Sequence, residues 1–397
     1  MSIREAAEKW GVSPRLVNQF CAEGRIPGAR KLGNTWAIPE ESRKPEDPRS
    51  VRRSGERKGP EDGRSPVPVP GLMPLMNSAF PPGQCLAWVN AMEEGPRRQI
   101  ALTEYHYFSG HPEEAVKEAE GFLTCEDLEV RLSACLIYAF ASLSMGQIQR
   151  ARFALAEVEI ALASSDGTPQ VRAAAAFVAS AAAVLLHLPL PEGLPTPSEF
   201  LLLLPPGLRA FALYVQANRL YLQEEYERSA GIVEATLAMQ GMDYPIPAIY
   251  LHLVAVMDYM SLRRQEEARA HLLAAWAVAR PDDLIEGFGE HHGLLGGMLE
   301  AVIKKEWPED FKRIIAITYR FSAGWRRVHN PATGHDVADN LTTTEFAAAM
   351  LAARGWTNQE IGAHMSISPN TVKRHISAVL QKLNISCRQD LKKYMLR

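Results

Sequence analysis

Three polar side chains near the end of this 397-residue chain have the types and spacing that reading a base sequence requires. Lys373, Arg374 and Ser377 are at positions i, i+1 and i+4, so a helix would place them on one side. Apolar residues recur on the other side at spacings of four, three and four, at Val372, Ile376, Val379 and Leu383. Lysine and arginine donate hydrogen bonds to guanine, and serine can contact several bases. The pattern therefore predicts a helix that is buried on one side and lies in the major groove of DNA on the other.

Capping signals place this helix in a set of four. The predicted helices are Thr343–Arg354, Asn358–Met365, Pro369–Leu383 and Cys387–Leu396. Capping boxes pair Thr342 with Glu345, Thr357 with Glu360 and Ser386 with Gln389, and Ser368 precedes Pro369 as an N-cap. Only residues 366–368 separate the second and third helices, which predicts a tight helix-turn-helix.

The motifs of residues 341–397 resemble the LuxR-type DNA-binding domain. The matching residues, in order, are Leu341-Thr342-Thr-Thr-Glu345, Gly355, Asn358-Gln-Glu360-Ile361, Ile367-Ser368, Thr371-Val372-Lys373-Arg-His375, Lys382-Leu383 and Arg388. The resemblance implies that Lys373, Arg374 and Ser377 read bases of double-stranded DNA, and that the last helix joins two chains into a homodimer. The DNA backbone would be contacted by Thr357, Ser368, Asn370, Thr371 and Lys382. Gln359 replaces a lysine common in the family, which is expected to weaken phosphate contact.

A second helix-turn-helix is predicted at the start of the chain. Ser2 and Glu5 form a capping box for a helix that ends at Trp10, and Ser13-Pro14 begins a helix that ends at Ala22. Residues 30–38 then alternate as a strand, a Gly33-Asn34 turn and a second strand. The expected core residues are Ala6, Ala7, Trp10, Val12, Val17 and Phe20.

Residues 1–40 are similar to the MerR/excisionase-type winged helix. The resemblance rests on Ile3-Arg-Glu-Ala-Ala7, Gly11-Val-Ser-Pro14, Glu23-Gly24-Arg-Ile26-Pro and Trp36-Ala-Ile38-Pro. It implies that Arg15, Asn18 and Gln19 enter the major groove and that Arg30 and Lys31 touch phosphate. MerR proteins continue into a dimerising coiled coil, whereas residues 41–83 form a Pro- and charge-rich linker here. Dimerisation through this end therefore stays open, and a winged helix kept for protein contact is the alternative.

Residues 84–335 have a helical pattern with a weak internal repeat. Four segments share a turn followed five positions later by a small residue: Gly110-His-Pro-Glu-Glu-Ala115, Gly146-Gln-Ile-Gln-Arg-Ala151, Glu224-Glu-Tyr-Glu-Arg-Ser229 and Arg263-Arg-Gln-Glu-Glu-Ala268. The small residues are 36, 78 and 39 positions apart, and each turn follows an aromatic-rich helix. The spacing resembles tetratricopeptide repeats, in which a small residue lets two helices cross closely. An irregular helical bundle is the alternative.

Charge is distributed unevenly along the chain. Residues 1–58 hold 13 Lys and Arg against 8 Asp and Glu, and residues 341–397 hold 8 against 3. Each end therefore carries +5 and the remainder −13, within a total of −3. Both predicted DNA readers are basic, and the acidic middle would not compete for DNA.

No pattern in the sequence predicts a catalytic, cofactor or metal site. The chain has no P-loop and no Ser-His-Asp set, and its five cysteines are scattered without a C-x-x-C pair. Glu290-His291-His292 could suggest a metal, but adjacent side chains point apart on a helix. The apolar run Ala173–Leu188 spans only 16 residues, which predicts a buried helix rather than a membrane span. No signal peptide is apparent, and a cytoplasmic protein is expected.

These features predict a mostly α chain with a small winged helix-turn-helix, a central repeat array and a C-terminal four-helix domain. The expected function is sequence-specific regulation of transcription, with the middle sensing a small molecule, a peptide or a protein. A helical-repeat scaffold whose ends contact proteins or assist DNA architecture is the alternative. An enzyme in the middle has no motif in its favour, and only a buried, convergent polar cluster would revive it.

Overall fold

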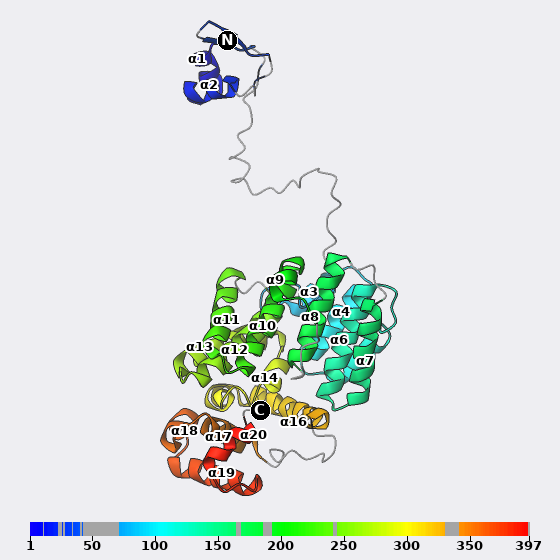
Figure 1. Ribbon diagram of the computed structural model, residues 1–397, viewed down its shortest axis with the longest axis vertical. Coiled ribbons are helices and arrows are strands. Elements are labelled where there is room, and N and C mark those ends of the chain that lie inside the picture. The colour runs from blue at the N-terminus through cyan, green and yellow to red at the C-terminus, as the bar shows by residue number, and fades with distance from the viewer. Residues whose placement is uncertain are drawn as a thin grey trace. The chain divides into compact units, whose positions relative to one another are not determined.

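The computed structural model describes residues 1–10, 12–22, 26, 28–33, 35–39, 42, 71–163, 168–185, 193–240, 244–329 and 341–395. They belong to two compact units, Met1–Val67 and Pro68–Arg397 (Figure 1). The chain is mostly helical, as predicted, and the sheet in the described ranges is a single two-stranded hairpin.

The first unit contains two helices and this hairpin where the sequence predicts them. The elements are α1 (Ile3–Trp10), α2 (Pro14–Ala22), β1 (Arg30–Leu32) and β2 (Thr35–Ala37). The capping box of α1 is formed, because the Ser2 amide donates to the Glu5 carboxylate at 2.7 Å and the Glu5 amide donates to Ser2 Oγ at 3.4 Å. The strands are antiparallel, with Lys31 opposite Trp36. The buried core consists of Ala6, Ala7, Val17, Phe20, Cys21, Ile26 and Ile38, and Trp10 and Val12 pack at its edge.

The second unit begins with a long series of helices. They are α3 (Cys85–Ala91), α4 (Pro96–Phe108), α5 (Pro112–Glu120), α6 (Leu128–Ser144), α7 (Ile148–Ala163), α8 (Pro169–Leu185), α9 (Pro197–Phe200), α10 (Pro206–Leu222), α11 (Tyr226–Gln240), α12 (Pro245–Ser261), α13 (Gln265–Ala279), α14 (Glu286–Glu290), α15 (Lys304–Glu306) and α16 (Pro308–His329). Short 3-10 turns occur at Leu201–Leu203 and Arg280–Asp282, and a π turn at Leu299–Ile303. We call α3 to α16 the helical array. Its most enclosed member is α12, in which every residue from Pro245 to Met260 is buried.

The four turns of the predicted repeat share one geometry. Gly110, Gly146, Glu224 and Arg263 have φ values of +86°, +72°, +60° and +61°. In each turn the next amide donates to the carbonyl five residues earlier, at 2.7–3.0 Å. This pattern is the Schellman end of a helix, which requires the left-handed conformation at that position. The small residues that follow, Ala115, Ala151, Ser229 and Ala268, are all buried where α4–α5, α6–α7, α10–α11 and α12–α13 pack together.

Replacing Gly110 with alanine is expected to destabilise the second unit by about 1–2 kcal/mol, because a left-handed conformation is strained for residues with a Cβ. That Cβ would also lie 3.1 Å from Ile317 Cδ1. Gly231 is the matched control, since it lies inside α11 with open space around it. Gly231→Ala should raise stability by about 0.5–1 kcal/mol through helix propensity. Urea unfolding followed by circular dichroism measures both, and shifts of the same sign would contradict the assignment of the turn.

The predicted linker, residues 41–83, extends too far at its C-terminal end. Leu72, Leu75, Met76 and Phe80 are buried in the core of the second unit. The Glu104 carboxylate accepts hydrogen bonds from the amides of Leu75 and Met76 at 3.0 and 2.9 Å. The high proline content of this segment pointed to a linker, but its apolar stretch from Gly71 to Met76 packs on α4 and α6. The amide of Met73, for example, donates to Ser133 Oγ of α6. Residues 43–70 lie outside the described ranges.

The C-terminal helices do not form a separate compact unit. The apolar residues of 341–395 belong to the same continuous core as those of the array, so these helices are part of the compact unit Pro68–Arg397. The part of the apolar run that the structure describes, residues 173–185, lies in α8 and contributes seven buried residues. None of the described helices is both long and apolar enough to cross a membrane.

Candidate nucleic-acid interface

The C-terminal segment contains the predicted helix-turn-helix. Its helices are α17 (Thr343–Ala353), α18 (Asn358–Met365), α19 (Pro369–Lys382) and α20 (Leu391–Met395). Both T-x-x-E capping boxes are formed, by Thr342 with Glu345 and by Thr357 with Glu360. Ser366 adopts φ +57° between α18 and α19, which closes the turn.

The predicted start of the last helix is wrong. Cys387 precedes a 3-10 turn, Arg388–Asp390, and α20 begins only at Leu391. The predicted capping box of Ser386 and Gln389 is not formed. The side-chain oxygen of Gln389 accepts from the Cys387 thiol instead of the Ser386 amide. Arg388, which donates to Asn358 Oδ1 at 2.5 Å and to the Trp356 carbonyl, fixes this irregular segment against α18.

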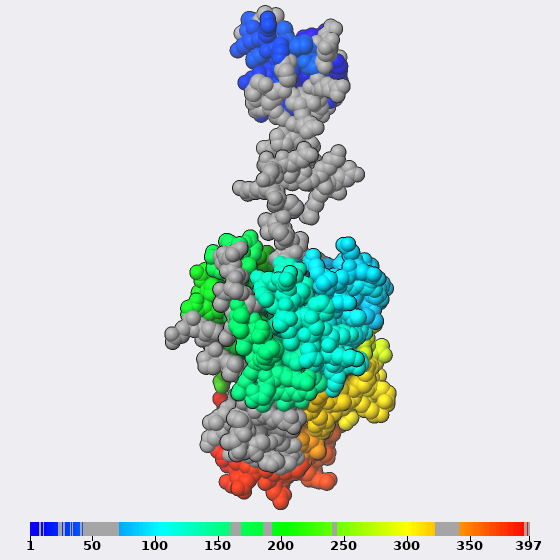
Figure 2. All heavy atoms as spheres, turned by 90° about the vertical axis from the view of Figure 1, so that its right-hand side faces the viewer, coloured from blue at the N-terminus to red at the C-terminus, as the bar shows by residue number. Residues whose placement is uncertain are grey.

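Helix α19 has the two faces that the sequence predicts. Val372, Ile376 and Val379 are buried in the bundle. Lys373, Arg374 and Ser377 are exposed on the other side. Figure 1 shows α19 on the side of the C-terminal segment that faces away from the array, and Figure 2 shows the orange and red atoms of this segment at the end of the second unit. The donors of α19 are therefore accessible, which is the arrangement that insertion into a major groove requires.

Four of the five predicted backbone-contacting residues gather at the starts of α18 and α19. Thr357 and Ser368 are the N-caps of these helices, and Asn370 and Thr371 follow Ser368 in the first turn of α19. Ser368 Oγ accepts from the Thr371 amide at 3.0 Å. Helix N-termini carry partial positive charge and unpaired amides, so this edge suits phosphate oxygens.

Lys382 is not brought to that edge. It ends α19, and its ammonium lies 2.7 Å from the Glu345 carboxylate of α17. Burial opposes ionisation of Glu345, but the hydrogen bonds from Lys382 and Thr342 outweigh it, and the pKa of Glu345 is lowered. Lys382 therefore ties α19 to the capping box of α17.

The comparisons with known proteins agree with this geometry. Residues 339–395 match the family described as bacterial regulatory proteins, luxR family. They form a luxR-family domain. A curated protein of Hyphomicrobium methylovorum, named "Probable transcriptional regulatory protein SgaR", is 33% identical to this chain over 87 residues. The match covers 22% of this chain and 41% of that protein, so the chain spans about two fifths of its relative's length. No solved structure matches the chain.

An arginine of the luxR-family domain extends into the array and binds it by hydrogen bonds. Nη2 of Arg354, which follows α17, donates to the Tyr221 hydroxyl of α10 at 2.7 Å and to the Leu294 carbonyl at 2.9 Å. In the reverse direction, Arg263 of the array donates to the Gly355 carbonyl at 2.7 Å. Lys392 of α20 lies 3.7 Å from Glu224. We call this contact the docking surface.

Glycines shape the docking surface on the array side. A Cβ at Gly293 would lie 2.3 Å from Phe346 Cε1, and one at Gly296 would lie 2.7 Å from Arg354 Nη1. His364 Nε2 lies 3.0 Å from the Gly296 carbonyl. Sequence reasoning missed this surface, although the run Gly293-Leu-Leu-Gly-Gly297 was a signal that another part of the chain approaches closely.

Asp258 of α12 is an acidic group whose charge interacts with Arg354. Its side chain is fully buried next to Ser229. Burial raises the pKa of Asp258 to about 8, although a hydrogen bond from Ser229 and the charge of Arg354 act in the opposite direction. Because the folded protein then holds this proton more tightly than the unfolded chain, stability falls as the pH rises from about 4 towards 8.

Replacing Asp258 with asparagine should remove this part of the pH dependence. Between pH 5.5 and 8 the melting temperature of the wild type is expected to fall by roughly 2–4 °C relative to that of Asp258→Asn. Glu309→Gln, which removes an exposed carboxylate from α16, serves as the control and should parallel the wild type. Parallel curves for wild type and Asp258→Asn would contradict the raised pKa.

A buried polar network around α14 is a cluster of the kind that would favour an enzyme in the array. Glu286 accepts from Ser144 Oγ at 2.8 Å and from Arg320 Nη2 at 2.7 Å. Glu290 accepts from the hydroxyls of Tyr107 and Tyr250. Each of these carboxylate oxygens thus already has a partner from another helix, and the network joins α14 to α4, α6, α12 and α16. Sequence reasoning missed it because the partners lie 34 to 183 positions away in the chain.

The Glu290-His291-His292 run does not converge on a common centre. His291 Nε2 lies 3.0 Å from the Tyr214 hydroxyl, and His292 Nε2 lies 2.8 Å from Glu300 Oε1. In the described ranges no group of three His, Cys, Asp or Glu side chains is placed to hold a metal ion.

The predicted contact residues of the first unit are exposed on its surface. Arg15, Asn18 and Gln19 follow one side of α2, opposite the buried Val17 and Phe20. Arg30 and Lys31 lie on β1. Their positions fit a recognition helix followed by a hairpin.

Proposed function

We propose that this chain is a sequence-specific DNA-binding regulator of transcription. The observation that carries the proposal is the luxR-family domain, whose helix α19 exposes Lys373, Arg374 and Ser377 while its other face is buried. Lys373 and Arg374 would donate to guanine edges and Ser377 to a neighbouring base. Thr357, Ser368, Asn370 and Thr371 would position the domain on phosphates.

The array is proposed to act as the sensing part, built from tetratricopeptide-like helix pairs. It contacts the luxR-family domain through α17, α18, the segment after α17 and Lys392 of α20, and leaves the donor face of α19 exposed. Control would therefore act on the position and pairing of the domains and not by covering α19. Two chains would pair through α20, as the family resemblance implies, and pairing would raise affinity because one small reader contributes little alone.

The first unit is proposed to be a second DNA contact. Arg15, Asn18 and Gln19 would enter the major groove, and Arg30 and Lys31 would approach phosphate. Its basic charge supports this role.

Selection of DNA from a random library by the full-length protein tests the proposal. We expect one enriched motif, and affinity for it that falls steeply with salt because phosphates are neutralised. Enrichment of no motif, with equal affinity for all sequences, would favour the helical-repeat scaffold or DNA-architectural role instead.

A further inference from the structure

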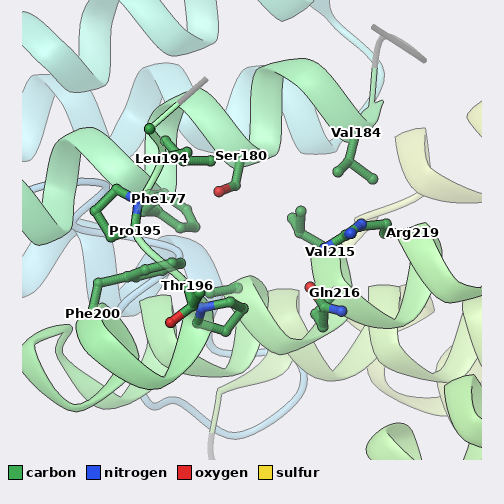
Figure 3. A pocket seen from close by; sticks show the side chains of 13 residues that line it. Phe177, Ser180, Val184, Leu194, Pro195, Thr196, Phe200, Val215, Gln216 and Arg219 are labelled. Atoms are coloured by element: carbon green, nitrogen blue, oxygen red, sulfur yellow. The ribbon is translucent and has the colours of Figure 1, made fainter. Parts of the chain in front are cut away.

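A pocket of about 200 Å³ opens in the array between α8, the segment before α9, and α10 (Figure 3). Its apolar wall includes Phe177, Phe200 and Val215, and its polar side chains include Ser180, Gln216 and Arg219. In Figure 3 these side chains border the same space, those of Phe177 and Ser180 from α8 and those of Val215, Gln216 and Arg219 from α10. The wall is thus mostly apolar with a few polar groups, which is the usual composition of a small-molecule site.

The volume of the pocket limits what it can hold. A cavity of about 150 Å³ lined by aliphatic and aromatic side chains accommodates benzene. A pocket of about 200 Å³ therefore has room for a body the size of a benzene ring and one small polar group. A nucleotide, a peptide or a long acyl chain could not be fully enclosed in this volume.

The charge of the pocket lining indicates which polar group a ligand would carry. Among the lining residues Arg219 alone is charged, and it is half-buried. Its planar guanidinium matches a carboxylate with two parallel hydrogen bonds, which apolar surroundings strengthen. Gln216 and Ser180 add hydrogen-bond donors to the same lining.

We propose that this pocket binds a small monocarboxylate with an aromatic or branched apolar body. The proposal deepens the sensing role assigned to the array, and its regulatory meaning rests on the proposed function. Arg219 and Tyr221 belong to the last turns of α10, and Tyr221 accepts the hydrogen bond from Arg354 of the luxR-family domain. A ligand held by Arg219 would therefore act on the helix end that holds the docking surface.

Isothermal titration of the full-length protein in the absence of DNA tests the pocket. The probes are benzoate, phenylacetate and 4-methylpentanoate, with benzamide as a neutral analogue and acetate as a carboxylate without the apolar body. We expect saturable one-site binding of at least one of the three carboxylates. Benzamide and acetate should bind at least about 10-fold more weakly, as expected for losing a charge-assisted hydrogen bond or the apolar contact.

Two pocket variants and one control assign the binding to this site. Arg219→Met should weaken the binding about 10-fold or more, and Ser180→Leu should weaken it by filling space. Arg228→Met removes an exposed arginine from α11 and should bind as the wild type does. Melting temperatures verify that each variant folds.

Failure of all three carboxylates to bind the wild type would overturn the proposal, as would unchanged binding by both pocket variants. Because the titration contains no DNA, either result leaves the DNA selection untouched. A protein that binds a carboxylate but selects no DNA motif would contradict the proposed function and not the pocket.

Discussion

Replacing Lys373 and Arg374 together with alanine should reduce affinity for the selected DNA motif at least about 30-fold, while the protein stays folded. Each bidentate contact to a base is worth about 1–3 kcal/mol, so losing two costs about 2 kcal/mol or more. Both side chains are exposed, and the core of α19 is formed by other residues, so folding should not suffer. Fluorescence anisotropy with the motif and with a scrambled duplex measures the change in selectivity.

A charge-matched control separates base reading from general attraction. Arg228→Ala with Lys312→Ala also removes two exposed cations, both from the array, and should leave affinity for the motif within about twofold. The double variant of α19 should bind motif and scrambled duplex almost equally. Retained selectivity in that variant would remove α19 from its assigned role.

Replacing Arg354 with methionine should release the luxR-family domain from the array. The change removes the hydrogen bonds to Tyr221 and Leu294, and it takes away the positive charge that interacts with Asp258. Charged hydrogen bonds are worth about 1.5–3 kcal/mol each, so we expect docking to weaken by roughly 2–4 kcal/mol. Hydrogen exchange should therefore accelerate in residues 293–297 and 354–356.

A second variant reaches the docking surface from the other side. Gly293→Val would place a side chain where Phe346 lies, and should accelerate exchange in the same residues. Arg313→Met, which removes an arginine paired with Asp283 in the array, is the control and should leave those residues protected. Faster exchange throughout α12 would show general unfolding instead. Unchanged exchange in Arg354→Met would contradict the role of Arg354 in the docking surface. The DNA motif should be the same for all these proteins, because α19 is not altered.

Helix α19 and its two faces could be predicted because the sequence signals for them are local. Capping boxes at Thr342 and Thr357 involve residues three positions apart, and the stripe from Val372 to Val379 follows the period of one helix. The array's turns were equally local, since one hydrogen-bond pattern recurs at Gly110, Gly146, Glu224 and Arg263. In two of the turns the left-handed position is occupied by Glu224 or Arg263 in place of glycine, and the same hydrogen bond still forms there.

Features that depend on distant residues could not be predicted. The burial of Leu72 and Met76 depends on Glu104 and on helices that the local proline content does not reveal. The net charge of +5 in residues 341–397 indicates contact with DNA but does not show which cations make it. The structure turns Arg354 into the array, Lys382 to Glu345 and Arg388 to Asn358. The charge of this region thus combines exposed cations, which we propose to contact DNA, with cations that stabilise the fold.

Genome-wide mapping of the sites bound by the wild type and by the Lys373→Ala, Arg374→Ala variant tests the central claim most directly. For the wild type we expect discrete sites that share one sequence motif and lie upstream of genes, as for a regulator of transcription. For the variant we expect those sites to disappear while the protein level is unchanged. Sites without a shared motif, or the same sites in both proteins, would contradict sequence-specific regulation through α19.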